Sequence, residues 1–378
     1  MIEADDGGRG ALRVFAVAAL ALAGFALSLT PLSAALDDRL LDREWQVLRR
    51  FAPKPAPDDI VVVGIDPASM ESIPAPPGLW HEQLGLALAR IASARPRAIG
   101  FNYPLPERSY DAIHPGLDRA LLVGIAAAVR NGPFVAALNI DARTRSARRI
   151  HTPFLAVLGD SRLGIGLLAR DDDGVTRRFS LAIPTEDGSF PTFAGRLCRA
   201  LSKTCGDGLI DYSLGPAFRY VSLKKVLETQ DAPLLERLFR ERIVLVGEVQ
   251  PYADRVATLV NLAGWEGPGR DSPAIVVHAQ SLRTALASAP EEASRPLAVL
   301  LLSIAALAFL IRDWRVAFAA AALAAVVAIV GAVAALWSGL YIALAPALAT
   351  LALATLARAA TALRARRTSG TRNNRHSA

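Results

Sequence analysis

The stretch IVVVGID at residues 60–66 decides the fold of the central part of the chain, together with HEQLGLALARIASA at 81–94 and AIGFN at 98–102. The first is apolar and rich in β-branched residues, which is typical of a buried strand. The second repeats apolar residues at every third or fourth position, the pattern of a helix with one buried face, and Pro96 ends it. The third is again strand-like. The sequence therefore predicts a β-α-β unit, for which parallel strands and a right-handed crossover are the rule.

The same alternation continues along the chain and indicates an α/β domain. Further helices are expected at 117–129, 234–240 and 278–287, and further strands at 134–138, 243–246 and 274–277. Residues 163–168 and 177–183 flank an Asp-Asp-Asp-Gly turn, which predicts an antiparallel hairpin. We therefore expect a mixed, partly parallel sheet with flanking helices.

Apolar, uncharged runs indicate that part of the chain lies in lipid. Hydrophobic residues make up 52% of the 378 residues. Residues 14–36 can cross a hydrocarbon core about 30 Å thick, although a cleaved signal peptide is the alternative. Residues 316–357 are about twice as long as one span requires, which predicts a helical hairpin. Residues 296–311 form either a short span or a helix in the interface.

Basic residues orient the predicted spans. About four transmembrane helices are expected, one near the N-terminus and three near the C-terminus, at 14–36, 296–311, 316–337 and 338–357. The RDWR turn at 312–315 and the Arg-rich tail at 358–378 then fall on one side, which the positive-inside rule makes cytoplasmic. Residues 1–13 are then cytoplasmic and residues 37–295 form an extracytoplasmic domain. This layout predicts a multi-pass protein of the bacterial cytoplasmic (inner) membrane, with its large domain in the periplasm or outside the cell.

The formal charge of +7 has a local origin, because the tail at 358–378 holds six Arg and no acid. A nucleic-acid partner is one interpretation of such a charge. A basic cluster beside a span, however, usually anchors topology and contacts anionic lipid. We therefore expect membrane lipid, and no nucleic acid, as a partner.

The two cysteines, Cys198 and Cys205, lie where a predicted helix runs into a Gly-rich turn. On one straight helix they would be about 10 Å apart, too far for a disulfide. If the helix stops near Lys203, the second thiol can fold back and a disulfide is possible in an oxidising compartment. The sequence leaves both arrangements open.

Three polar residues follow predicted strands: Asp66, Asn102 and Glu248. They are candidate ligand-binding residues, because open α/β sheets bind ligands at the carboxyl ends of their strands. The alternative is that each residue only begins a loop. His278, at a predicted strand-to-helix junction, is a further candidate that could bind a ligand or respond to pH. Its alternative is a buried, hydrogen-bonded histidine.

Sequence motifs for catalysis and for nucleotide binding are absent. Gly64 and Gly247 follow strands but begin neither GxGxxG nor a P-loop, and the sequence contains no HExxH and no GxSxG. The acidic run 171–173 is rich in oxygen ligands, yet it lacks the alternating spacing of a calcium loop, which favours a turn. We therefore expect no cofactor, no metal and no catalytic residue.

Six stretches carry a family resemblance. They are Asp38-Arg39, IVVVGID at 60–66, PRAIGFN at 96–102, DDDGVTRR at 171–178, RIVLVGE at 242–248 with the later Asp254, and VVHAQSL at 276–282. In this order they resemble the type-2 CHASE domain, the extracellular sensory domain in front of bacterial cyclases, histidine kinases and protein kinases. The layout of one span before and three after also resembles the family's. The resemblance implies reception of an extracytoplasmic signal and its transmission through the spans to a cytoplasmic output domain.

Two positions depart from the family's pattern. Asn102 stands where such domains usually show Asp, and Leu79-Trp80-His81-Glu82 replaces a Trp-Pro-x-Arg type segment. The resemblance adds Trp80 and Asp254 to the candidate ligand-binding residues. The sequence holds 21 residues after its last predicted span, too few for a kinase or a cyclase. We therefore expect any output to belong to a membrane or cytoplasmic partner protein.

The favoured function is a non-catalytic sensor or receptor subunit that detects an extracytoplasmic signal and biases a partner through its spans. The alternative is a structural or docking subunit of an envelope membrane complex. An extracytoplasmic enzyme is the third hypothesis, supported only by the acidic strand ends. Small residues crowd the last predicted spans, which permits close helix packing and hence a homo-oligomer.

Overall fold

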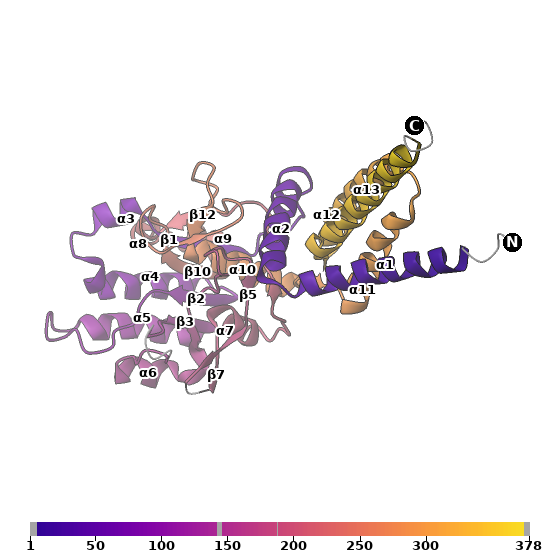
Figure 1. The fold of residues 1–378 in the computed structure, drawn as a ribbon. Helices are drawn as coiled ribbons and strands as arrows, with labels where there is room; N and C mark the ends of the chain where they lie inside the picture. The colour runs from indigo at the N-terminus through magenta and orange to yellow at the C-terminus, as the bar shows by residue number, and fades with distance from the viewer. Residues whose placement is uncertain (1–5, 142–145, 187, 374–378) are drawn as a thin grey trace. The chain divides into compact units, whose positions relative to one another are not determined.

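The computed structural model describes residues 6–141, 146–186 and 188–373, and the chain divides into two compact units (Figure 1). Arg49–Ala289 form what we call the α/β unit. Met1–Leu48 and Pro290–Ala378 form the helical unit. Each unit is described by itself.

The α/β unit is built on a central sheet with helices on both faces. The strands of this sheet are β1 (Ile60–Ile65), β2 (Ala98–Asn102), β3 (Phe134–Leu138), β4 (Leu163–Ile165), β9 (Tyr220–Ser222) and β10 (Ile243–Glu248). The helices are α3 (Pro67–Ser72), η1 (Pro77–Leu79), α4 (His81–Ser93), α5 (Leu117–Asn131), α6 (Thr152–Leu158), η2 (Asp160–Arg162), α7 (Phe193–Ala200), α8 (Leu223–Glu228), α9 (Ala232–Phe239) and α10 (Ala274–Ala287). The short strands outside the sheet are β5 (Arg178–Phe179), β6 (Ala182–Thr185), β7 (Gly188–Pro191), β8 (Gly208–Leu209), β11 (Arg255–Ala257) and β12 (Asp271–Pro273).

The six strands of the central sheet have the order β4-β3-β2-β10-β1-β9, and every neighbouring pair is parallel. The predicted β-α-β unit is confirmed as parallel, but β10 lies between its two strands: Leu245 pairs with Val62 on one side and Gly100 on the other. Because all six strands run the same way, their carboxyl ends meet at one edge of the sheet. This edge is where a ligand site is expected.

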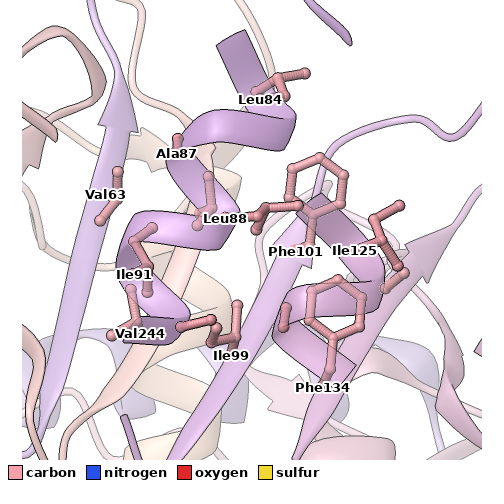
Figure 2. Close-up of a cluster of buried hydrophobic side chains, with 14 of the residues drawn as sticks. Val63, Leu84, Ala87, Leu88, Ile91, Ile99, Phe101, Ile125, Phe134 and Val244 are labelled. Atoms are coloured by element: carbon pink, nitrogen blue, oxygen red, sulfur yellow. The ribbon is translucent and has the colours of Figure 1, made fainter. Parts of the chain in front are cut away.

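The core of the α/β unit lies between the sheet and the helices on one of its faces, α4, α5, α6, α8 and α9, while α7 and α10 contact the other face. Alternate strand residues, such as Val63 on β1 and Phe101 on β2, point toward α4 and α5 (Figure 2). Leu88 and Ile91 of α4 meet them and are fully buried. The apolar stripe that predicted this helix is therefore the face that packs on the sheet.

The predicted hairpin between 163–168 and 177–183 is wrong. β4 pairs in parallel with β3 at the edge of the central sheet. After the acidic turn, Thr176 donates its backbone N–H to the oxygen of Ala257 at 2.9 Å, and β5 pairs with β8. These partners come from later parts of the chain, which a local turn pattern cannot reveal. The α/β class with a parallel sheet is confirmed, whereas the antiparallel pairs of the described residues lie outside that sheet.

The predicted strand at 274–277 is also wrong, because these residues form the first turn of α10. Every residue from 274 to 285 is buried, and the first turn, 274–277, carries only apolar side chains, so it shows no polar face in its sequence. A short apolar run without such a face has the same composition as a buried strand. His278 consequently lies inside a helix rather than at a junction.

Cys198 and Cys205 form a disulfide, with their Cα atoms 6.3 Å apart. Helix α7 ends at Ala200, and Lys203 donates its backbone N–H to the oxygen of Cys198 at 2.9 Å. The chain therefore turns back on itself after α7, which brings the second sulfur within bonding distance.

The part of the helical unit that the structure describes contains four apolar helical segments. Its elements are α1 (Asp6–Ser28), α2 (Pro31–Phe51), β13 (Glu291–Glu292), α11 (Arg295–Ala306), η3 (Leu307–Leu310), α12 (Trp314–Trp337), β14 (Leu340–Tyr341) and α13 (Ala345–Asn373). Among the described residues, three helices are long and apolar enough to cross a membrane, at Ala11–Ser28, Trp314–Trp337 and Ala345–Arg364. Pro296–Leu310 is shorter.

Two predicted spans have different bounds in the structure. The uncharged run 14–36 is not one helix, because α1 ends at Ser28 and α2 begins at Pro31, which cannot continue a preceding helix. The segment after α12 is not yet helical, since β14 pairs there with β13 and α13 begins only at Ala345. Charge-free composition predicts which residues enter lipid, but not where a helix breaks.

Candidate functional site

A cavity of about 540 Å³ opens at the carboxyl edge of the central sheet. Its wall includes Tyr103 directly after β2, Leu138 and Asn139 at the end of β3, and Glu248 at the end of β10. Because β3, β2 and β10 are neighbours, three consecutive strands deliver side chains to one place. This position and size are those of a small-molecule site in an open parallel sheet.

Two loops enclose the cavity, one between β2 and α5 and one between β3 and α6. Across them, His151 donates its backbone N–H to the oxygen of Pro106 at 2.7 Å, and the Arg148 guanidinium pairs with Glu107 at 2.8 Å. Arg148 also donates its backbone N–H to Asn139 at 2.8 Å. The two loops are therefore tied to each other and to the end of β3.

A buried carboxylate, Asp118 in the first turn of α5, fixes the first of these loops. It accepts hydrogen bonds from the Ser109 hydroxyl at 2.7 Å and from the backbone N–H of Tyr110 at 3.1 Å. Nδ1 of His81, which lines the cavity, lies 3.5 Å from the same carboxylate. Burial lowers the pKa of His81, although the charge of Asp118 opposes this. The imidazole is thus neutral at pH 7, and this wall is held by internal contacts.

Glu248 and Tyr103 give the cavity two side chains that can form hydrogen bonds and whose pKa values are raised. Burial, together with the negative charge of Asp254, raises the pKa of the half-buried Glu248 carboxyl. Burial and the charge of Glu248 likewise raise the pKa of Tyr103, whose hydroxyl donates to the oxygen of Pro77 at 2.7 Å. Glu248 therefore takes up a proton more readily than an exposed glutamate and can then donate, as well as accept, a hydrogen bond.

The mouth of the cavity is rich in charge of both signs. Arg108, Arg148, Arg149 and Glu107 line the cavity, and all four side chains are exposed. Arg148 is paired with Glu107. Three guanidinium groups against the carboxyls of Glu107 and Glu248 suit a small polar ligand that carries an acidic group.

Asp66 and Trp80, two of the predicted site residues, have structural roles. Asp66 caps α3 by accepting from the backbone N–H of Ser69 at 3.0 Å, and it also accepts from the Ser222 hydroxyl at 2.9 Å. Trp80 is fully buried, and its indole N–H donates to the oxygen of Ala75 at 2.6 Å. Neither residue lines the cavity, because local bonds already use their polar atoms.

Asn102, Asp254 and His278 also lie outside the cavity wall. Asn102 ends β2, with its amide oxygen close to Gly166. Asp254 is an exposed residue with a left-handed backbone (φ 48°), and its carbonyl accepts from Ala274 at 2.8 Å. His278 lies 3.1 Å from the oxygen of Gly166 through Nε2. Of the six predicted residues, Glu248 is the one that the structure places in the cavity wall.

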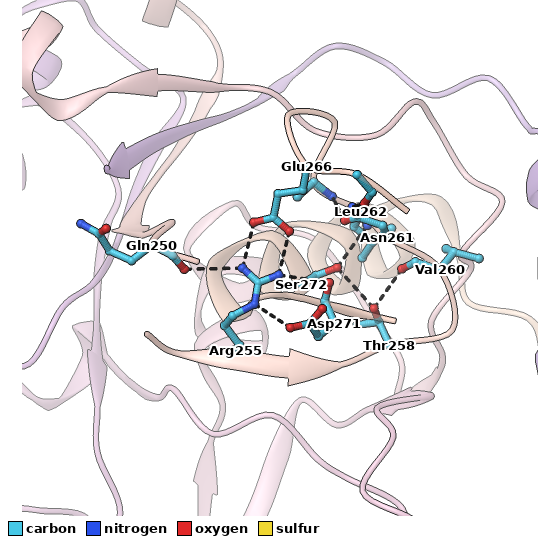
Figure 3. A network of polar contacts seen from close by, with 11 residues as sticks. Gln250, Arg255, Thr258, Val260, Asn261, Leu262, Glu266, Asp271 and Ser272 are labelled. Carbon is cyan, nitrogen blue, oxygen red and sulfur yellow. Dashed lines mark hydrogen bonds and ion pairs between the residues drawn. The ribbon is translucent and has the colours of Figure 1, made fainter. Parts of the chain in front are cut away.

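The loop that follows β10 is closed by its own polar network (Figure 3). The Arg255 guanidinium makes two bonds to Glu266, at 2.7 and 2.8 Å, and one to Asp271 at 2.7 Å. These carboxylates raise the pKa of Arg255. Glu266 and Asp271 therefore stabilise the loop through Arg255.

The sequence patterns did not indicate most of the residues in the cavity wall. The residues that they did not select are His81, Tyr103, Arg108, Tyr110, Arg148 and Arg149. One signal was present, since Arg148 and Arg149 are adjacent in the loop after the third strand of the chain, at the sheet edge where a ligand is expected. The remaining residues reach the cavity through the course of two irregular loops, which no periodic pattern encodes.

The described residues therefore combine a parallel α/β unit that has a polar cavity with helices that are long and apolar enough to cross a membrane. A family model for the CHASE2 domain matches residues 15–324, and the chain belongs to this family. The CHASE2 domain is an extracellular sensory domain and not a catalytic one. No curated protein and no solved structure matches the chain.

The protein is expected to lose about 2 kcal/mol of stability between pH 7 and pH 5 through His278 alone. Burial lowers the pKa of His278 to about 4, whereas an unfolded histidine titrates near 6.5. Between these values the unfolded state binds the extra proton, so the contribution is full above pH 6.5 and falls as the pH drops toward 4. Urea unfolding at pH 7 and pH 5 measures it. His278→Gln should show a smaller loss, and an equal loss in both proteins would contradict the assignment.

Proposed function

We propose that this chain is a membrane-anchored, non-catalytic sensor that binds a small polar ligand with an acidic group in the cavity of the α/β unit. The observation that carries the proposal is the convergence of Glu248, Tyr103 and the three arginines on one cavity beside three strand ends. The family also supports a sensor role, because the CHASE2 domain is a sensory domain. The ligand would close the two loops further, because it can bridge groups that come from both.

We further propose where the large domain lies and how its signal is passed on. The large domain lies in the periplasm or outside the cell of a bacterium, with four spans in the inner membrane, Pro296–Leu310 being the short one. The Cys198–Cys205 disulfide supports an oxidising compartment for this domain. The helical unit then passes the signal to a separate membrane or cytoplasmic partner by shifting the populations of its conformations.

Ligand binding is tested by thermal unfolding of the full-length protein in detergent, with free amino acids and small mono- and dicarboxylates as probes and uncharged sugars as a contrast. A true ligand at 100 times its Kd should stabilise the protein by about 2.7 kcal/mol. For a domain of this size that is a shift of roughly 5–10 °C. Arg149→Gln should weaken the binding about tenfold or more, because it removes a charge-assisted hydrogen bond.

Glu236→Gln is the matched control, because Glu236 pairs with Arg240 on the surface of α9, and it does not line the cavity. It should leave ligand binding unchanged. Stabilisation by a probe that survives Arg149→Gln and Glu248→Gln together would place the ligand elsewhere. If none of the acidic probes stabilises the protein more than the sugars do, the proposed ligand class is wrong.

A further inference from the structure

A second, smaller cavity lies in the helical unit, at the end of the helix bundle where the N-terminal part of α1 meets the C-terminal half of α13. Its volume is about 120 Å³. The lining residues are Leu12, Arg13, Ala16, Phe309, Leu310, Arg312, Arg358 and Thr361. They come from α1, from η3 with the turn after it, and from α13, so three separate segments of the chain build this site.

Three arginines converge on this cavity, one from each segment. Arg358 is half-buried and fixed, because its guanidinium donates to the oxygen of Ile311 at 2.8 Å and also to the oxygen of Arg312. Arg13 and Arg312 are exposed, and the structure pairs neither with an acid among the described residues. The cavity wall contains no Asp or Glu. Among the residues that the structure describes, three positive charges thus line a space whose wall holds no compensating negative group.

Aspartate does occur nearby, but it is engaged elsewhere. Asp313 directly follows Arg312, and its carboxylate accepts from the backbone N–H of Arg315 at 2.8 Å as the cap of α12. A carboxylate at a helix N-terminus is stabilised there by the helix dipole. It is therefore not the partner for which the three arginines are arranged.

Apart from Thr361, the rest of the wall is apolar, and parts of it are exposed on helices that would contact lipid. Leu12, on α1, is 69% exposed and Leu310 is 46% exposed, although both lie beside the arginines. Trp314, which begins α12, carries the indole typical of the boundary between lipid and water. A site that combines arginines with exposed leucines matches a molecule with a charged head and an acyl chain.

We propose that this cavity binds the phosphate headgroup of an anionic phospholipid. Two or three guanidinium groups would hold the phosphate oxygens, while Leu12 and Phe309 contact the first methylenes of the acyl chains. Because Arg13, Arg312 and Arg358 belong to α1, the turn before α12, and α13, one lipid would cross-link the N-terminal span to the C-terminal spans. In the proposed orientation this lipid lies in the cytoplasmic leaflet, at the end of the spans from which a signal would leave.

The test is native mass spectrometry of the full-length protein in a zwitterionic detergent, titrated with phosphatidylglycerol, with phosphatidylcholine and with inorganic phosphate. Phosphatidylglycerol should occupy one site at least tenfold more tightly than phosphatidylcholine. Arg13→Gln and Arg312→Gln should each weaken it about fivefold, the effect of removing one arginine at a membrane surface. Both side chains are exposed, so neither change should disturb folding, which the melting temperature verifies.

Arg315→Gln is the matched control. It removes the same charge three residues from Arg312, yet Arg315 lies outside the cavity wall, over the Trp314 ring. It should leave the lipid affinity unchanged. An equal loss in Arg315→Gln and Arg312→Gln would show diffuse attraction of lipid to a basic surface and would overturn the proposal. So would equal binding of phosphatidylcholine, or displacement of the lipid by inorganic phosphate at equimolar concentration.

Discussion

Replacing Gly124 by valine is expected to lower the free energy of unfolding of the α/β unit by about 3 kcal/mol or more. Gly124 on α5 faces Gly85 on α4 so closely that a β-carbon added to Gly124 would lie 2.1 Å from the backbone oxygen of Gly85. A helix backbone cannot move aside as a flexible side chain can, so the two helices must separate. Their separation would open the core around Leu88 and Ile125, which packs at close to crystal density.

Thermal unfolding of the full-length protein in detergent measures this effect, at about 2–4 °C per kcal/mol for a domain of this size. The melting temperature should fall by roughly 6–12 °C, and Gly124→Ala should fall by less. Gly267→Ala is the control, since nothing lies within 4 Å of a β-carbon at Gly267, and it should not change the melting temperature. A Gly124→Val protein that melts like the wild type would show that α4 and α5 are not in backbone contact.

Much of the sheet could be predicted from sequence because its strands are buried on both faces. Stretches such as 60–66 and 243–248 are continuous apolar runs. The helical stripe at 81–94 follows the first of these runs in the sequence. Local patterns of this kind fix each element and its direction. They do not fix which strands are neighbours, so the insertion of β10 between β1 and β2 could not be foreseen.

The same limit explains the errors. The acidic turn at 171–174 was recognised, but its flanking segments pair with distant parts of the chain. The residues 274–277 look like a strand because α10 is buried on every side. In both cases, tertiary contacts override a local preference.

The cavity was predictable in position but not in composition. Strand ends mark the sheet edge, and Glu248 was selected for that reason. Asp66 satisfies the same rule but accepts hydrogen bonds from Ser69 and Ser222, and Asn102 also lies outside the cavity wall. A polar residue at a strand end either binds a ligand or stabilises the loop that it begins. The sequence does not show which of the two roles applies, because the hydrogen-bond partners come from other segments of the chain.

The double replacement Asp171→Asn and Asp173→Asn is expected to cost about 3 kcal/mol, because it removes two carboxylates that pair with a buried cation. The Arg177 side chain is 1% exposed. It makes two bonds to Asp173, at 2.8 and 2.7 Å, and one to Asp171 at 3.0 Å. Neutral amides cannot compensate the charge of Arg177. The estimate is at the lower end of the usual range for buried ion pairs, since water reaches the half-exposed Asp173.

The same ion pairs make this turn sensitive to acid. The hydrogen bonds from Arg177 lower the pKa of Asp173 to about 2, against about 4 for an unfolded aspartate. Its contribution to stability is therefore present above pH 4 and is lost as the pH falls toward 2. Urea unfolding of the full-length protein at pH 7 measures the cost of the double replacement.

Two further variants separate the loss of the ion pair from a general loss of charge. Asp172→Asn removes one charge from the same turn, but Asp172 is exposed and makes no ion pair among the described residues, so stability should be unchanged. Adding Arg177→Met to the double variant removes the cation that has lost the carboxylates of Asp171 and Asp173 and should recover most of the lost stability, because apolar replacement of a buried ion pair is close to neutral. If the triple variant is as unstable as the double one, the cost arises from the turn backbone and not from a buried charge.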